Sequence, residues 1–364
     1  MEEFGKLEER VVLVGVQTGD NDNVEESLDE LKELASTAGA VTVGRIIQNR
    51  ESVHPGTYIG KGKIEEVRAL VYAMDATGII CDDELSPAQL NNLERELDCK
   101  VMDRTLLILD IFAARAITSE GKIQVELAQL RYRSARLVGL RESLSRLGGG
   151  IGTRGPGEKK LETDRRLIRT RISALKQELS QVEKHRELIR SSRARGNMKT
   201  AAIVGYTNAG KSTLLNALTG ADILAEDKLF ATLDPTTRSL KLPSSQEILL
   251  TDTVGFIRKL PHHLIDAFRS TLEEAKYADI ILHVVDASNP QMDEQMYVVY
   301  ETLQRLEAMD KPVVTAFNKM DRIGESLTVR DFKADRIVQV SAKTGEGLVV
   351  QTGTAQLIAG VARC

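Results

Sequence analysis

The sequence predicts an α/β protein in three parts: a small parallel α/β domain, an antiparallel helical hairpin and a second α/β domain. Over residues 1–113, apolar strand-like runs alternate with helix-like stretches. Residues 114–197 instead repeat apolar side chains at intervals of three and four around a glycine-rich connection. From residue 198 to 364 the alternation resumes, and we expect an atypical or truncated C-terminal end because the last stretch lacks a clean helical stripe.

The first part is expected to form a parallel sheet covered by helices. We expect strands at 11–16, 40–48 and 77–83 and helices at 23–36, 63–74 and 86–98. Ser86 is a plausible helix cap, and Pro87 suits the first helical position. The glycine- and lysine-rich stretch Pro55–Val67 has two interpretations, a contact with RNA or a second nucleotide, or a simple turn before a helix.

The middle part predicts two long helices with narrow apolar seams at heptad-like spacing. Their seams comprise Ile123, Leu127, Leu130, Leu137 and Leu144 in the first helix and Leu161, Ile168, Ile172, Leu175, Leu179, Val182 and Ile189 in the second. The glycine-rich connection implies an antiparallel hairpin. Residues 131–195 hold 18 Lys/Arg and 7 Asp/Glu, a net charge of +11 in a chain of net charge −4. This asymmetry predicts contact with a polyanion.

Composition excludes several classes of protein. The chain has no run of about 18 uncharged apolar residues, so no membrane span is expected. Its N-terminus lacks the apolar core of a signal peptide. The three cysteines and five histidines have neither disulfide nor zinc-site spacing. We therefore expect a cytoplasmic protein, and a monomer.

The stretch GYTNAGKST (Gly205–Thr213) matches the phosphate-loop pattern G-x-x-x-x-G-K-[ST] between an expected strand and an expected helix. Its backbone N–H groups would surround phosphates, and the helix N-terminus would add its dipole. Lys211 would reach the β- and γ-phosphate oxygens, and the Ser212 hydroxyl would ligate Mg²⁺. The binding residues expected here are Gly205, Tyr206, Thr207, Asn208, Ala209, Gly210, Lys211 and Ser212.

Three further motifs follow in order and predict a guanine nucleotide. Asp252 ends a strand in LLTDTVGF, where a carboxylate can hold the magnesium shell and the Gly255 N–H can meet the γ-phosphate. Asp321 in NKMD can accept hydrogens from guanine N1 and N2, which favours GTP over ATP. The backbone of SAK can meet guanine O6. The binding residues expected from these motifs are Asp252, Thr253, Val254, Gly255, Asn318, Lys319, Met320, Asp321, Ser341, Ala342 and Lys343.

These motifs resemble those of translation-factor-related GTPases with a P-loop GTPase domain. LFATLDPTTR (Leu229–Arg238), GTYIGKGK, QVELAQLRYRSARLVG and GGGIGTRGPGEKKLETDRR are similar to the HflX family, and the resemblance extends to about Gly347. It implies that Thr232 is a second protein ligand of Mg²⁺ beside Ser212. It also implies nucleotide contacts at Phe230, Ala231, Leu233 and Asp234, and GTP hydrolysis coupled to binding the large ribosomal subunit and splitting stalled ribosomes.

The catalytic group stays unassigned at this point. Ras-like enzymes place a water-orienting glutamine directly after the D-x-x-G motif, whereas this chain has Phe256. A phenyl ring cannot orient water by hydrogen bonding. We expect slow intrinsic hydrolysis that the ribosome accelerates, unless another group in the chain serves. Asn208 could ligand a potassium ion, and a turn-forming asparagine is an equal alternative.

The connection RLGGGIGTRGPGEKK (Arg146–Lys160) is not a second nucleotide loop, because it lacks the G-K-[ST] ending and lies between helices. Its cations Arg146, Arg154, Lys159 and Lys160 are candidates for contacts with RNA phosphates. A solvated charged connection is the alternative. The HflX resemblance implies that this tip enters the ribosomal functional centre.

Three functions fit these observations. The leading hypothesis is a GTP hydrolase that remodels ribosomes, with GTP or GDP, the large ribosomal subunit and its RNA as partners. The second is a GTP-dependent binding switch that recruits a partner. The third is a GTPase that assists ribosome assembly or RNA modification.

Overall fold

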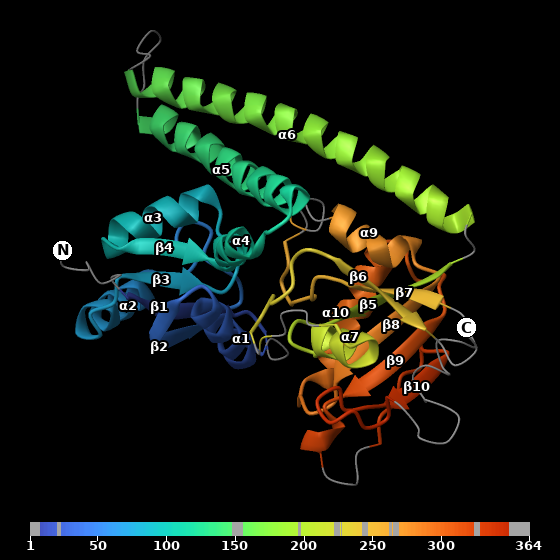
Figure 1. Ribbon diagram of the computed structural model, residues 1–364. Coiled ribbons are helices and arrows are strands. Elements are labelled where there is room, and N and C mark those ends of the chain that lie inside the picture. The colour runs from blue at the N-terminus through green and yellow to red at the C-terminus, as the bar shows by residue number, and fades with distance from the viewer. Residues whose placement is uncertain are drawn as a thin grey trace, which may run out of the picture. The chain divides into compact units, whose positions relative to one another are not determined.

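The structure is a computed structural model, and Figure 1 shows its helices and strands. It describes residues 8–19, 23–147, 156–195, 198–221, 226, 228–241, 247–261, 264, 269–323 and 328–348. The chain divides into two compact units, Met1–Ala114 with Val125–Glu178 and Arg115–Gln124 with Leu179–Cys364. The division of the sequence at residues 113 and 197 stays a prediction.

The first unit contains a four-stranded parallel sheet in the order β2-β1-β3-β4. Its elements are β1 (Glu9–Gln17), α1 (Val24–Thr37), β2 (Ala40–Asn49), α2 (Lys61–Ala73), β3 (Gly78–Cys81), α3 (Pro87–Leu97), β4 (Lys100–Asp103) and α4 (Arg104–Arg115). The expected α/β alternation is confirmed, and β4 and α4 extend it. Ser86 caps α3 in a capping box with Gln89.

Both faces of this sheet are covered, which explains why β1 is a continuous apolar run. Val12, Val14 and Val16 share a buried core with side chains from α2 and α3. The residues between them point to the opposite face because strand side chains alternate. There a side chain on Gly15 would lie only 2.6 Å from Val24 of α1.

The middle of the chain forms the expected antiparallel hairpin (Figure 1). Its helices are α5 (Ser119–Leu147) and α6 (Pro156–Arg195). Within the first unit, Arg171 of α6 pairs with Glu126 of α5 at 2.7 Å. Within the second unit, Arg186 pairs with Glu120 at 2.7 Å. Residues farther along α6 therefore contact residues nearer the start of α5, as antiparallel helices require.

Leu127 and Leu175 of the predicted seams are buried. In the first unit α5 is also anchored to the carboxyl end of β4. Tyr132 donates its hydroxyl hydrogen to Oδ1 of the buried Asp103 at 2.8 Å, and Arg136 pairs with Oδ2 at 2.5 Å. A buried carboxylate that is paired and hydrogen-bonded fixes this part of α5, because breaking such a pair leaves an uncompensated charge.

The second unit contains a six-stranded sheet in the order β10-β9-β8-β5-β7-β6, in which only β6 runs antiparallel. Its elements are β5 (Lys199–Gly205), α7 (Lys211–Thr219), β6 (Thr236–Lys241), β7 (Glu247–Asp252), α9 (Arg269–Tyr277), β8 (Ile280–Asp286), α10 (Met292–Arg305), β9 (Val313–Asn318), the 3₁₀ turn η1 (Met320–Arg322) and β10 (Arg336–Gln339). The carboxyl ends of the parallel strands meet at one edge, where ligands bind in open α/β sheets.

Two expectations fall outside the described residues. They are the glycine-rich tip at 148–155 and the atypical C-terminal end from residue 349. Among the helices that are described, none is long and apolar enough to cross a membrane.

Candidate nucleotide-binding site

The phosphate loop connects β5 to α7 at the carboxyl edge of the six-stranded sheet, and two positions in it require glycine. A side chain on Gly205 would overlap the Val284 carbonyl of β8. Gly210 has φ +92°, and a side chain there would overlap the Asn318 amide. Gly210 caps α7 without a side-chain hydrogen bond. The first N–H groups of α7 can therefore bind an anion.

Lys211 is buried at the first position of α7. Its Nζ donates hydrogen bonds to the carbonyl oxygens of Tyr206 at 2.9 Å and Gly205 at 3.3 Å. Burial lowers the pKa of Lys211 to about 8, with Asp252 opposing the shift and Lys319 adding to it. A bound phosphate would favour the protonated amine, because an opposite charge stabilises the charged form.

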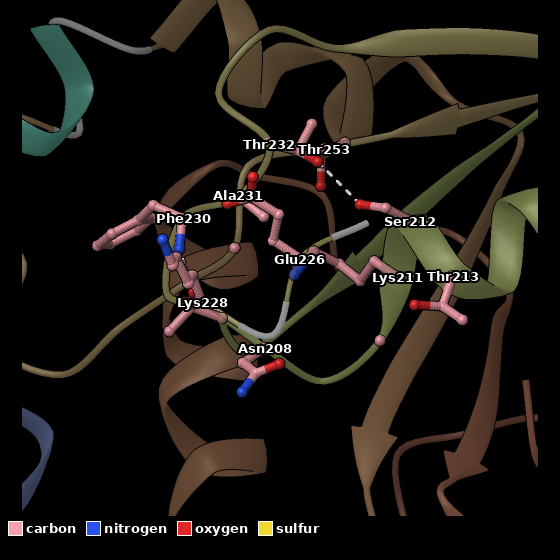
Figure 2. Close-up of a pocket in the computed structure, with 13 residues that line it drawn as sticks. Asn208, Lys211, Ser212, Thr213, Glu226, Lys228, Phe230, Ala231, Thr232 and Thr253 are labelled. Carbon is pink, nitrogen blue, oxygen red and sulfur yellow. Dashed lines mark hydrogen bonds between the residues drawn. The ribbon is translucent and has the colours of Figure 1, made fainter. Parts of the chain in front are cut away.

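Three oxygens gather next to the lysine and fit a magnesium ion. Ser212 Oγ lies 2.8 Å from Thr232 Oγ1 and donates to Asp252 Oδ2 at 2.6 Å, and Figure 2 shows the Ser212–Thr232 bond. Asp252 Oδ1 is buried without a partner among the described residues. Burial raises the pKa of Asp252, while Lys211 lowers it. Hydroxyl and carboxylate oxygens suit Mg²⁺, which when bound neutralises charge on the β- and γ-phosphates.

Hydrogen bonds from the backbone and from one side chain connect the phosphate loop to the segments around Phe230 and Phe256. Thr207 Oγ1 accepts from the Phe230 N–H at 2.8 Å, and the Thr207 N–H donates to the Phe256 carbonyl at 2.7 Å. The Phe256 N–H donates to the Gly205 carbonyl at 3.1 Å. A side chain on Gly255 would lie 2.7 Å from Thr207 Cα. The glycine of D-x-x-G therefore permits this close approach.

The base-binding motifs form a second cluster. Asn318 links two loops, because its Nδ2 donates to the Ala209 carbonyl at 2.9 Å and its Oδ1 accepts from the Ala342 N–H at 2.9 Å. Ser341 Oγ donates to Asp321 Oδ1 at 2.6 Å. This hydrogen bond is the main cause of a lowered pKa at Asp321. The carboxylate is therefore charged and held in place for a guanine edge.

Lys319 belongs to the same cluster and has a left-handed backbone conformation, with φ +63°. Its Nζ donates to the Asn208 carbonyl at 2.9 Å and pairs with Asp286 at 2.7 Å. Asn208 is also left-handed, with φ +60°, as a turn-forming asparagine would be. Its side chain lies at the pocket in Figure 2, and a potassium contact stays a prediction.

Two adjoining pockets hold most of the expected residues. The phosphate pocket is lined by Thr207, Asn208, Gly210, Lys211, Ser212, Thr213, Glu226, Lys228, Phe230, Ala231, Thr232, Thr253 and Gly255. The base pocket is lined by Asn208, Gly210, Thr213, Glu226, Asn318, Lys319, Asp321, Arg322, Ala342 and Lys343. The expected residues outside both linings are Gly205, Tyr206, Ala209, Leu233, Asp234, Asp252, Val254, Met320 and Ser341.

Sequence reasoning missed several residues of these pockets. Thr213 directly follows the phosphate-loop pattern, and Lys228 directly precedes LFATLDPTTR, so position alone could have suggested both. Glu226 lines both pockets and pairs with Arg115 at 2.6 Å. Arg322 follows Asp321 in the base pocket. An acidic residue beside phosphates carries no motif, so no sequence signal identified Glu226.

Residues 55–60 of the stretch Pro55–Val67 form a packed turn before α2, and residues 61–67 are the first residues of that helix. Tyr58 is buried and donates its hydroxyl hydrogen to Asp83 at 2.7 Å. Asn92 of α3 donates to the Gly56 carbonyl at 2.8 Å. These bonds explain the turn as a packed part of the fold, and a contact with RNA or a second nucleotide there stays a prediction.

The predicted RNA contacts of the hairpin tip lie outside the described structure. Arg154 is among residues 148–155, and the side chains of Arg146, Lys159 and Lys160 are likewise outside the described part. Their contacts with RNA stay a prediction.

Three family models match consecutive stretches of the chain. They are described as a GTP-binding GTPase N-terminal region at residues 25–113, a GTP-binding GTPase middle region at residues 115–193 and a 50S ribosome-binding GTPase at residues 200–319. The third range contains the phosphate loop, Asp252 and the first two residues of NKMD.

Whole-chain relatives agree with these matches. The chain is 71% identical to the GTPase HflX of Lacrimispora saccharolytica over 95% of its own length and 82% of the relative. It is 47% identical to the GTPase HflX of Escherichia coli over 93% of its own length and 80% of the relative. Among solved structures, the SsGBP and GDP complex matches 97% of this chain and 98% of that chain at 25% identity, with a TM-score of 0.52.

Proposed function

The chain belongs to the HflX family of GTPases and is a GTP-hydrolysing enzyme, and on this premise we propose that it binds the large ribosomal subunit and uses GTP to remodel or split stalled ribosomes. The family model for residues 200–319 is described as a 50S ribosome-binding GTPase, which supports the first half of the proposal. We also propose that the chain acts in the cytoplasm, together with the ribosomes that it would bind.

One observation carries the proposal that a partner completes the GTPase site. Phe256, directly after the D-x-x-G motif, is 1% exposed. It lies outside the lining of the phosphate pocket, although Thr253 and Gly255 of the same segment are part of it. At this position the chain offers no hydrogen-bonding side chain to an attacking water. We therefore infer a slow intrinsic reaction that the ribosome accelerates, with the catalytic group unassigned.

The site residues supply the remaining requirements of phosphoryl transfer, which are positioning and charge stabilisation. Lys211 and the N–H groups of α7 would bind the phosphates. Ser212 and Thr232 would hold Mg²⁺, with Asp252 hydrogen-bonded to Ser212. Asp321 would select guanine. A potassium ion at Asn208 would add positive charge beside the phosphates.

The hairpin supports the ribosomal half of the proposal through its charge. Residues 131–195 have a net charge of +11, and on α6 the side chains of Arg166 and Arg169 are exposed. Phosphate contacts dominate protein affinity for RNA and position the protein on it. We infer that the tip between α5 and α6 carries Arg146, Arg154, Lys159 and Lys160 into contact with ribosomal RNA.

The experiment compares the full chain with a variant in which the connection 148–155 is replaced by a short turn. Ribosome splitting is followed by light scattering, and nucleotide affinity is measured in parallel. The variant should bind GTP normally and split ribosomes far more slowly. Neutralising Arg154, Lys159 and Lys160 should reduce the salt slope of ribosome binding by roughly one unit for each RNA phosphate that is no longer bound.

The alternatives predict other outcomes. A shortened variant that splits ribosomes at the normal rate would show that the tip is a solvated connection. Tight GTP-dependent binding to subunits without splitting would favour a binding switch, or a GTPase that assists ribosome assembly or RNA modification.

A further inference from the structure

Asp234 lies two residues after the predicted magnesium ligand Thr232, yet it is outside the linings of both nucleotide pockets. Its Oδ2 accepts hydrogen bonds from the N–H groups of Ile117 at 2.8 Å and Thr118 at 3.0 Å. Its Oδ1 accepts the hydroxyl hydrogen of Thr118. We call the stretch from Glu226 to Asp234, which includes Thr232, the nucleotide-binding segment. Within the second unit, three hydrogen bonds join this segment to Ile117 and Thr118, which precede α5.

Thr118 sits at the N-terminus of α5 and acts as its cap. Its Oγ1 accepts from the Gly121 N–H at 2.9 Å, and its carbonyl accepts from the Lys122 N–H at 3.0 Å. The Asp234 carboxylate lies directly in front of this helix end. A negative charge is stabilising there, because the unpaired N–H groups give the helix N-terminus a partial positive charge.

Gly121, in the first turn of α5, makes room for the carboxylate. A side chain at this position would overlap Asp234 Oδ1 and lie 3.2 Å from Thr118 Oγ1. Glycine costs stability inside a helix relative to alanine. The close approach of Asp234 gives a reason for glycine here.

A fourth bond, an ion pair, joins the same two stretches of the chain. Arg115, the last residue of α4, pairs with Glu226 at 2.6 Å, and Glu226 lines both nucleotide pockets. Residues 115–118 therefore contact the nucleotide-binding segment before and after Thr232. Between these contacts, Thr232 Oγ1 bonds to Ser212.

We propose that Asp234 is a positioning residue that couples the placement of Thr232 over the magnesium site to the capping of α5. When residues 228–234 close over a nucleotide that carries a γ-phosphate, Asp234 reaches Thr118 and completes the cap. When they open, the cap loses its carboxylate. Because coupling between two sites is reciprocal, a partner that shifts the start of α5 changes the preference for triphosphate over diphosphate. The inference uses the nucleotide site and does not depend on ribosome binding.

The test measures dissociation constants of the full chain for fluorescent GppNHp and GDP with Mg²⁺. Thr118→Val removes the hydroxyl at nearly constant volume, and Gly121→Ala blocks the carboxylate. Both should weaken GppNHp binding about fivefold, the lower end of typical coupling, and leave GDP binding unchanged. Thr118→Ser, which keeps the hydroxyl, should bind both nucleotides like the natural chain.

Gly121→Ala separates coupling from helix stability. Alanine favours a helix, so a purely structural role predicts no loss of GppNHp affinity. Amide hydrogen exchange supplies a readout without turnover: residues 117–124 should exchange more slowly with GppNHp than with GDP in the natural chain, and equally with both in Gly121→Ala. The proposal is overturned if both variants keep the natural GppNHp-to-GDP ratio, or if exchange at 117–124 ignores the nucleotide in the natural chain.

Discussion

Guanine selection is predicted to depend on Asp321. In the natural chain Ser341 Oγ donates a hydrogen bond to Asp321 Oδ1 at 2.6 Å. The substitution Asp321→Asn keeps an oxygen that can accept this bond. It replaces the other carboxylate oxygen with an NH₂ donor. That donor would face the donor groups N1–H and N2–H₂ of guanine. The substitution therefore changes recognition while the residue stays anchored.

The size of the effect follows from the number and type of bonds. A hydrogen bond to a charged group contributes about 1.5–3 kcal/mol, and about 1.4 kcal/mol corresponds to tenfold in affinity. GTP binding should therefore weaken roughly 10- to 150-fold. Ser341→Ala removes a hydrogen bond that positions Asp321 but leaves both acceptor oxygens and the charge of the carboxylate, so it should weaken GTP binding less than Asp321→Asn does.

The assay is equilibrium titration with fluorescent GTP and xanthosine triphosphate. Xanthine carries a carbonyl where guanine has its amino group, so Asp321→Asn should bind the xanthine nucleotide better than the natural chain does. Equal GTP affinity in Asp321→Asn and the natural chain would refute the assignment of NKMD to the base.

Three further predictions concern the buried titratable groups Lys211 and His283. Lys211→Ala should abolish GTP turnover, measured as phosphate release, while calorimetry finds the unfolding of the first unit unchanged. Because burial lowers the Lys211 pKa to about 8 and phosphates need the charged amine, GDP affinity should fall by up to about tenfold per pH unit above pH 8; a flat titration profile between pH 7 and 9 would be inconsistent with this. Burial also lowers the pKa of His283, so the unfolded chain binds a proton that the folded chain excludes. As the pH decreases below about 6.5, the free energy of unfolding of the second unit should decrease by at most about 1.4 kcal/mol per pH unit. His283→Phe should reduce that slope in denaturant titrations.

Local patterns predicted much of this fold. The Ser86 cap and the six elements expected in residues 11–98 need only neighbouring residues, and so do the strand, loop and helix around Gly205–Thr213. The helical conformation of α4 is harder to predict from the sequence, because a short apolar segment without periodicity fits either a strand or a buried helix. Its first residue, Arg104, is buried against Asp82 and Glu30, a pairing that no local pattern contains.

Site residues that belong to a sequence motif could be predicted. Contacts between segments that are far apart in the chain could not. Ser212, Asp252 and Asp321 belong to motifs, and in the structure Ser212 Oγ lies 2.6 Å from Asp252 Oδ2. By contrast, the bond from Ile117 to Asp234 joins residues 117 positions apart. Contacts of that kind depend on tertiary packing, so the family resemblance implied only a nucleotide contact for Asp234.

The main inference is that a ribosomal partner completes a GTPase site that has Phe256 after its D-x-x-G motif. The decisive measurement is the GTP turnover of the full chain with and without purified large ribosomal subunits, with small subunits as the matched control. Large subunits should raise kcat about tenfold or more, because one added charge-stabilising group contributes at least that much, and small subunits should have little effect. Fast turnover by the isolated chain that neither subunit changes would contradict this inference.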